Sequence, residues 1–168
     1  MERSRRSFLG LLRAAAASLA AVAALAADGR GPAASAAEEL AFPVSPLTIE
    51  TSRGRFQFMV EMAETPSTWK QGLQNRQSMA PDAGMLFNYH QPREATMWMK
   101  DTLISLDMLF IDERGAIINI AERTQPMSLD VISSAGPVLA TLEVNAGTAA
   151  RLGIRPGDRV LHAIFAPR

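Results

Sequence analysis

Most of the chain alternates short apolar stretches with turn residues, and this pattern limits the fold to one built mainly from strands. The clearest example is a hairpin in which residues 108–111 and 116–120 flank the turn 112–115. A second hairpin is predicted to join residues 47–51 to residues 56–62, where every other side chain is apolar. Such alternation places the apolar side chains of a strand on one face, so both hairpins need a core to cover that face.

Only one segment has the pattern of a main helix. Thr65 suits the N-cap position, and Pro66 suits the first helical position. Trp69 and Arg76 then lie seven residues apart, which places them on the same helix face. The helix is predicted to end near Ser78.

The remaining apolar stretches are too short for long helices. They are predicted to form strands at residues 84–87, 96–99, 138–144 and 159–165, with a helical turn at 147–152. Strands this short and numerous, with one main helix and short helical turns, predict an α+β fold that is mainly antiparallel β, in the form of a small barrel or sandwich.

The first 36 residues differ in composition from the rest of the chain. Two adjacent arginines, Arg5 and Arg6, precede an apolar pair and a mildly hydrophobic run rich in alanine, which is the pattern of a twin-arginine signal peptide. Residues 1–36 are therefore predicted to direct export to the periplasm. Cleavage is expected after Ala34–Ala36, with Ala24–Ala26 as the second choice. An uncleaved membrane anchor is the alternative, and it would leave the domain in the same compartment.

Residues 37–46 are predicted to be a linker, and residues 47–168 a single β-rich domain. Without residues 1–36 the chain loses five of its 17 basic and two of its 17 acidic side chains, which leaves 12 and 15 and a net charge of −3. A nucleic-acid-binding protein needs a positive footprint, so nucleic acid is not an expected partner. The chain contains no cysteine, which excludes thiolate chemistry and cysteine-ligated zinc.

A series of blocks between Thr65 and Val160 resembles, in order, the family known as domain of unknown function 192. The blocks are Gly72-Leu73 with Arg76, Gly84–Phe87, Trp98–Thr102, Leu106-Asp107 with Phe110–Asp112, Leu142–Val144 and the turn Gly153–Asp158. The resemblance implies a small, strand-dominated and often exported domain, and it implies no particular activity. Two positions depart from the family pattern: Asp101 stands where asparagine is usual, and Ser105 where proline is usual.

Several charged side chains occur in apolar surroundings, and such charges are seldom buried without a partner. Arg76 lies on the apolar face of the predicted helix, Glu143 interrupts an apolar strand, and Asp107 directly precedes another. The candidate ligand-binding residues are Arg76, Trp98, Lys100, Asp101, Thr102, Asp107 and Glu143. One interpretation is a structural ion-pair network in which Arg76 clamps Asp107 or Glu143. The other is a shallow polar cleft beside Trp98 that holds a small anionic or hydroxyl-rich ligand.

Two further interpretations remain open. Asp107 and Glu143 could act as acid and base of a carboxylate-dependent enzyme on a cell-envelope glycan. The nine methionines, with Met97 and Met99 on one face of a strand, could handle copper, although methionine more often fills a core.

Nucleophilic catalysis has little support. The only histidines are His90 and His162, and no nucleophile elbow or phosphate-binding loop is present. The leading expectation is therefore a non-catalytic periplasmic binding or accessory protein. We expect a monomer with no resident cofactor or metal and no stable membrane span after cleavage, which binds a small polar ligand or a cell-envelope component.

Overall fold

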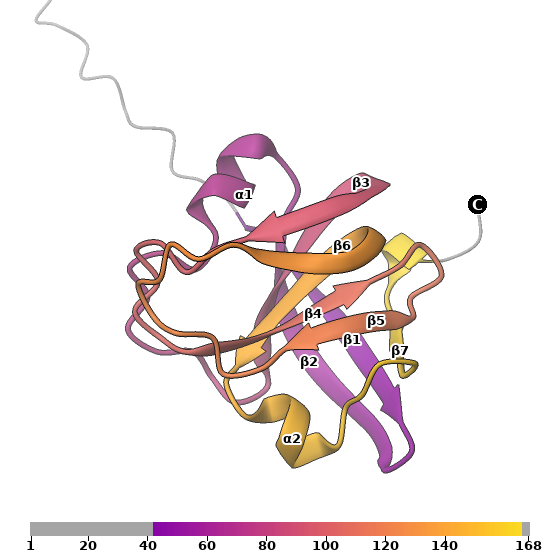
Figure 1. The fold of residues 1–168 in the computed structure, drawn as a ribbon. Helices are drawn as coiled ribbons and strands as arrows, with labels where there is room; N and C mark the ends of the chain where they lie inside the picture. The colour runs from indigo at the N-terminus through magenta and orange to yellow at the C-terminus, as the bar shows by residue number, and fades with distance from the viewer. Residues whose placement is uncertain (1–41, 166–168) are drawn as a thin grey trace, which may run out of the picture. The chain divides into compact units, whose positions relative to one another are not determined.

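The computed structural model describes residues 42–165, so the predicted signal peptide lies outside the described residues. Seven strands form one sheet in the order β5-β4-β6-β3-β2-β1-β7 (Figure 1). The strands are β1 (Val44–Thr51), β2 (Gly54–Ala63), β3 (Ala83–Met97), β4 (Leu106–Ile111), β5 (Ile117–Ala121), β6 (Ile132–Asn145) and β7 (Arg159–Leu161). The helices are α1 (Pro66–Gln71), α2 (Thr148–Leu152) and the 3₁₀ turn η1 (Ala163–Phe165). The mainly antiparallel, barrel-like architecture is confirmed.

Both predicted hairpins are present. β1 and β2 pair antiparallel up to Thr51 and Gly54, which flank the turn, and β4 pairs antiparallel with β5. β1 begins at Val44, three residues before the predicted start, so the last residues of the predicted linker belong to the sheet. Among the described residues, no helix is long and apolar enough to cross a membrane.

The helix between β2 and β3 is much shorter than predicted. Thr65 caps it as expected: its side chain accepts from the Thr68 N–H, while the Thr68 hydroxyl oxygen accepts from the Thr65 N–H at 2.9 Å. The helix ends at Gln71 because Gly72 adopts a φ of +45°, which does not continue a helix. The prediction of one main helix reaching Ser78 is therefore wrong, and α1 serves as a short crossover between the parallel strands β2 and β3.

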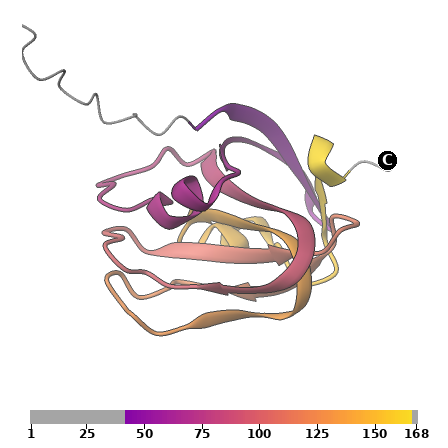
Figure 2. The same ribbon diagram turned by 90° about the horizontal axis from the view of Figure 1, so that it is seen from above.

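β3 and β6 are long strands that bend together (Figure 2). The predicted strand 84–87 lies within β3, and the predicted strand 96–99 contributes only its first two residues to the end of β3. β6 starts at Ile132 rather than residue 138. The pairing of β3 with β6 shifts register in two places, and His90 at the first shift has a φ of +63°. Such bulges bend a strand and break its regular alternation, which explains why β3 looked like two strands and a loop.

The two outer strands of the sheet meet and nearly close the barrel. Ala116 forms an isolated bridge with Arg159, and the Val160 N–H donates to the Gly115 carbonyl at 2.7 Å. Gly115 has a φ of +82°, and a Cβ there would lie 2.5 Å from the Val160 carbonyl oxygen. Only glycine tolerates both conditions, so this residue permits the closure.

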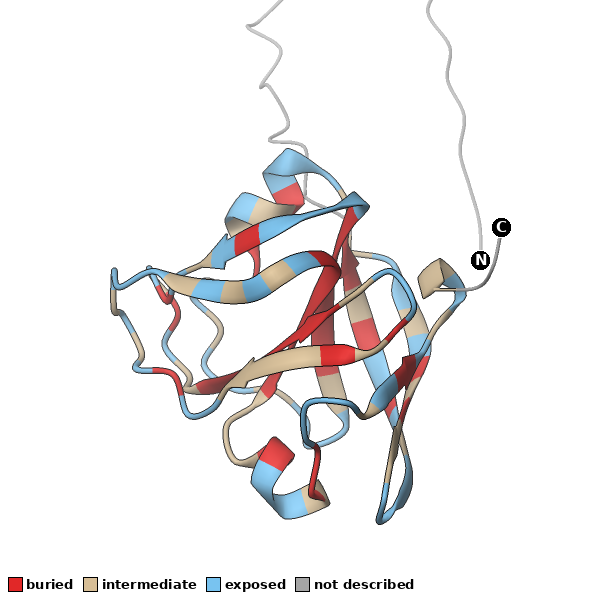
Figure 3. Ribbon diagram, turned by 45° about the vertical axis from the view of Figure 1, so that its right-hand side comes forward, coloured by how far each residue is buried: buried red, intermediate tan, exposed pale blue. Residues whose placement is uncertain are grey.

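Buried side chains form two clusters, one on each face of the sheet. Figure 3 shows that the buried residues are concentrated in the strands. The first lies inside the barrel and receives residues from all seven strands, including Ile49, Leu142 and Val160. The second lies on the outer face of β3, β4 and β6 and includes Phe87 and Phe110. Trp69 of α1 packs against this second cluster, so α1 covers the outer face, while α2 lies at the opposite end of the molecule (Figure 1).

Candidate functional site

A cleft with a volume of about 220 Å³ opens beside α1, above the second cluster. Its walls come from α1 with the turn that follows, from the bent outer half of β3, and from the loop after β3. Its aromatic and sulfur-containing lining is Trp69, Phe87, Tyr89, Met97 and Trp98. Its polar lining is Lys70, Gln71, Gln74, Arg93, Thr96, Lys100, Thr102 and Glu143.

Glu143 lies at the base of the cleft and is only 4 % exposed. Its neighbours across the sheet are Met85 on β3 and Met108 on β4. Burial raises the pKa of this carboxyl to about 8, so it is mostly protonated at neutral pH. Within residues 42–165 no side chain or backbone group hydrogen-bonds to it. Among these residues, every side-chain nitrogen or oxygen that is fully enclosed has a hydrogen-bond partner. Because the Glu143 oxygens have no such partner, they are not fully enclosed, and they face the cleft that Glu143 lines.

A fixed aromatic wall stands beside this carboxyl. The Trp69 indole N–H donates to the Ala63 carbonyl at 2.9 Å, and the Trp69 ring meets the Tyr89 ring edge-on with centroids 5.7 Å apart. The Tyr89 hydroxyl lies 2.9 Å from the Thr141 hydroxyl and donates to the Met97 sulfur at 3.3 Å. Burial raises the pKa of Tyr89 to about 12, so the phenol stays neutral. These contacts hold the wall in one orientation.

Three exposed cations surround the mouth of the cleft. The Arg93 guanidinium lies 4.9 Å from the centre of the Tyr89 ring and 5.8 Å from that of Trp69. The Lys100 ammonium lies 6.0 Å from the Trp98 ring, and Lys70 projects from α1. Among the described residues none of the three forms a salt bridge, so their charges remain available to a ligand.

The predicted site residues divide into two groups. Trp98, Lys100, Thr102 and Glu143 line the cleft, whereas Arg76, Asp101 and Asp107 do not. Arg76 lies beyond the end of α1 and forms a two-pronged ion pair with Glu61 of β2. The predicted clamp of Arg76 on Asp107 or Glu143 is therefore absent.

The other two predicted acids shape the backbone. Asp101 has a φ of +56°, and its carbonyl accepts from the Asn75 N–H, so it forms a tight turn. Aspartate, like the asparagine usual in the family, tolerates this conformation. Asp107 is completely buried and accepts from the N–H groups of Arg123, Gly147 and Ala149 at 2.8–3.1 Å. It therefore fixes the loop before α2 and the first turn of that helix.

Asp107 and Glu143 do not share a site. Met108 pairs directly with Glu143, so these two side chains lie on the same face of the sheet. Asp107 precedes Met108 and points to the opposite face, because side chains alternate along a strand. The acid–base pair that glycan cleavage would need is therefore not formed by these two residues.

Three residues of the cleft were not predicted as site residues from the sequence. Trp69 was predicted only as part of a helix face, and Tyr89 and Arg93 lie between the predicted strands 84–87 and 96–99. Tyr89 is the only tyrosine of the chain, and its hydroxyl group lies close in sequence to the apolar stretch 84–87. This combination of an apolar ring and a polar hydroxyl could have marked it as a candidate site residue. No sequence signal places Arg93 over both rings, because that position depends on the bulge.

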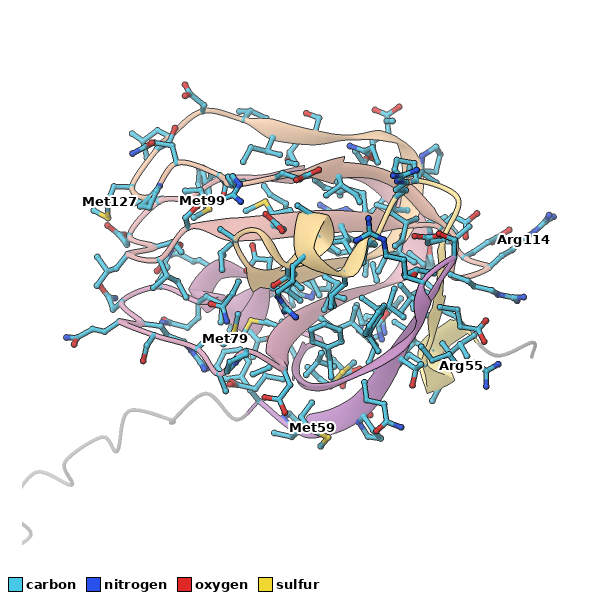
Figure 4. All side chains as sticks on the ribbon, turned by 90° about the horizontal axis from the view of Figure 1, so that it is seen from below. Arg55, Met59, Met79, Met99, Arg114 and Met127 are labelled. Carbon is cyan, nitrogen blue, oxygen red and sulfur yellow. The ribbon has the colours of Figure 1, made fainter. Side chains whose placement is uncertain are left out.

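Four methionines of the described residues are buried in the core, whereas Met59 and Met127 are about half exposed. Met85, Met99 and Met108 are completely buried in the second cluster, whereas Met62 lies in the first. The Met99 sulfur accepts from the Thr124 hydroxyl at 3.1 Å. Figure 4 shows the labelled residues Met59, Met79, Met99 and Met127 spread over the molecule. Within the described range, no three His, Asp or Glu side chains gather as they would to hold a metal ion.

A second hollow, with a volume of about 560 Å³, lies between β1, β2 and α2. Phe58 is its buried apolar side chain, and its charged side chains, Arg55, Asp82 and Arg151, are exposed. No buried charged group lines it, so the cleft above Glu143 is the stronger candidate site.

Comparison with known proteins gives a family and a fold. Residues 48–162 match the family described as "Uncharacterized ACR", which is domain of unknown function 192. One similar solved structure is a protein from Sinorhizobium meliloti 1021, whose name proposes it as a transcription regulator. It is 44% identical in sequence, has a TM-score of 0.73, and the match covers 75% of this chain and 98% of the relative. A protein of unknown function from Novosphingobium aromaticivorans DSM 12444 is 38% identical with a TM-score of 0.70 over 80% of this chain and 99% of its own. No curated protein matches.

Proposed function

This chain belongs to the domain of unknown function 192 family, and we propose that it is a non-catalytic binding protein for a small ligand that carries an anionic or hydroxyl-rich group. One observation carries the proposal: Glu143 is a buried carboxyl that has no hydrogen-bond partner within the described residues and faces an open cleft. A carboxyl that only stabilised the fold would be satisfied by neighbouring donors, as Asp107 is.

The cleft limits the size and charge of its ligand. A volume of about 220 Å³ is below the roughly 300–1,000 Å³ of sites for drug-sized molecules, so the ligand is a small metabolite or one end of a larger molecule. Because Glu143 is mostly protonated at neutral pH, the charges of Lys70, Arg93 and Lys100 dominate the site. This balance favours an anionic group at the mouth.

The charge of the chain argues against a nucleic-acid ligand. The name of the Sinorhizobium meliloti relative would place such a protein in transcription regulation. A net charge of −3 after removal of residues 1–36 gives no broad positive surface for phosphates, so we do not extend that role to this chain.

The binding test uses the fact that the only two tryptophans of the chain, Trp69 and Trp98, both line the cleft. Intrinsic fluorescence therefore reports on this site. We expect low-molecular-mass extract from the periplasm of the producing cell to change the emission of the wild-type domain, and to change that of the Glu143→Gln variant much less. The control is Glu113→Gln in the exposed β4–β5 turn, which should respond like the wild type. An equal response of all three proteins would contradict binding at Glu143.

We further propose that the protein acts in the periplasm after export by the twin-arginine route. The support is the adjacent pair Arg5 and Arg6 before the alanine-rich run. Replacing both by lysine should leave the full-length chain in the cytoplasm, as cell fractionation would detect. Unchanged recovery of the shorter chain from the periplasm would contradict this route.

A further inference from the structure

We infer that the ligand is a small zwitterion, with a protonated amine bound to Glu143 at the base and an anionic group bound by Arg93 and Lys100 at the mouth. The inference rests on the proposed function and names the class of ligand for the same cleft. Its basis is the arrangement of charge: one acid is buried beneath the aromatic wall, and three exposed cations surround the opening.

The base of the cleft is complementary to an amine. Glu143 lies among Met85, Met108 and the aromatic lining, where no described residue supplies a positive charge in hydrogen-bond contact. An ionised carboxylate in such surroundings is costly unless a cation pairs with it. An ammonium group supplies that charge together with N–H donors.

The mouth of the cleft selects against a ligand that is only a cation. Lys70, Arg93 and Lys100 would repel a simple amine, whereas they attract a carboxylate, phosphate or sulfate group. A simple anion, in turn, would satisfy the mouth but leave Glu143 without a partner. A molecule with both groups satisfies both ends of the cleft.

Binding of an amine should be coupled to loss of a proton. The charged or titratable groups around Glu143 are Tyr89 and Arg93 from β3, Lys100 from the loop after β3, and Lys70 from α1. The neighbouring strand β4 presents Met108, which has no charge. Burial raises the pKa of Glu143 to about 8, so the free protein holds this proton at neutral pH. When the ammonium binds, the proton passes from Glu143 to the buffer, and the affinity should rise as the pH increases from about 6 to about 8.

The test uses ω-amino acids from glycine to 6-aminohexanoate, with hexanoate and hexylamine as probes that carry only one of the two charges. Tryptophan fluorescence and titration calorimetry in two buffers of different ionisation enthalpy would give the affinity and the number of protons released. We expect at least one ω-amino acid to bind about tenfold or more tightly than either single-charge probe, which corresponds to about 1.4 kcal/mol. Proton release should accompany this binding at pH 7.

Variants identify the two ends of the site. Glu143→Gln should abolish both the proton release and the preference over hexanoate, while Arg93→Gln should abolish the preference over hexylamine. Arg114→Gln is the matched control, because Arg114 is exposed in the β4–β5 turn and does not line the cleft. Figure 4 shows it on the opposite side of the molecule from Met99 and Met127. Urea unfolding would show that each variant is folded.

The outcomes separate this inference from the proposed function. If hexanoate binds as tightly as every ω-amino acid and Glu143→Gln changes nothing, the ligand is a simple anion and the zwitterion is overturned, while a binding role stands. If no ω-amino acid binds with a Kd below about 1 mM, the zwitterion is also overturned. The response to periplasmic extract then decides the binding role by itself.

Discussion

Asp107 and Glu143 come from neighbouring strands, yet the sheet separates them: one carboxylate holds the backbone around α2, and the other carboxyl faces the cleft. Their roles should therefore separate on substitution. Asp107→Asn places an amide where three N–H groups need an acceptor, and it should lower the free energy of unfolding by about 3 kcal/mol in a urea titration. Asp112→Asn, at a half-buried position of the β4–β5 turn, should cost about 1 kcal/mol or less. Equal losses would contradict the role given to Asp107.

Ionisation of Glu143 should make the wild-type domain less stable as the pH rises. Native Glu143 keeps its proton up to about pH 8, whereas the unfolded chain loses it near 4.5, so the native state binds more protons between these values. The contribution of Glu143 to the free energy of unfolding should therefore decrease from about pH 5 to about pH 8 and then level off, whereas burial lowers the pKa of His162 and gives a contribution of the opposite sign. Glu143→Gln should remove this decrease and be more stable than the wild type at high pH, by on the order of 2–4 kcal/mol. Urea titrations across this pH range, with Glu113→Gln as the control, would measure the difference between the two proteins. Parallel plots of unfolding free energy against pH for the wild type and Glu143→Gln would disprove the prediction.

The hydroxyl pair of Tyr89 and Thr141 should show strong coupling in a double-mutant cycle. Tyr89→Phe leaves the completely buried Thr141 hydroxyl without this partner and should cost about 1–2 kcal/mol. Thr141→Val should also be costly, because the tyrosine hydroxyl then keeps only the weak Met97 sulfur contact. The double variant removes both polar groups and should cost less than the sum of the single changes. Additive losses would mean that the pair contributes nothing specific.

Closure of the barrel should depend on Gly115. Gly115→Ala brings a Cβ to 2.5 Å from the Val160 carbonyl and forces alanine to a φ of +82°. We expect a loss of about 2 kcal/mol or more and faster hydrogen exchange at the Val160 amide. Gly136→Ala is the matched control, because its Cβ would meet no atom within 4 Å, and it should be nearly neutral. Similar stability of the two variants would show that the edges need not meet here.

Features specified by neighbouring residues could be predicted from the sequence, and features specified by the tertiary fold could not. The two hairpins were predicted because alternation and turn residues lie next to each other in the chain. The end of α1 was misplaced because the apolar pattern of the predicted helix continues past Gly72. This glycine packs closely, with a Cβ position 3.2 Å from the Phe87 ring, and its positive φ ends the helix.

The site was predicted in part for the same reason. Glu143 was found because a charge in an apolar strand is conspicuous in any sequence. Arg76 attracted attention on the same argument, but its partner Glu61 lies 15 residues earlier on β2, and only the fold brings the two together. Arg93 reaches the cleft through the bend in β3, which no local pattern revealed.

The position of β7 has a consequence for synthesis. This strand pairs with β1 at Thr48–Glu50 and bridges to Ala116, so it joins the two ends of the sheet. Among the described strands it is also the last to leave the ribosome. Until then the growing chain carries unpaired strand edges, which are sites for association with other chains. Chains that terminate before Arg159 should therefore aggregate rather than fold into a smaller domain.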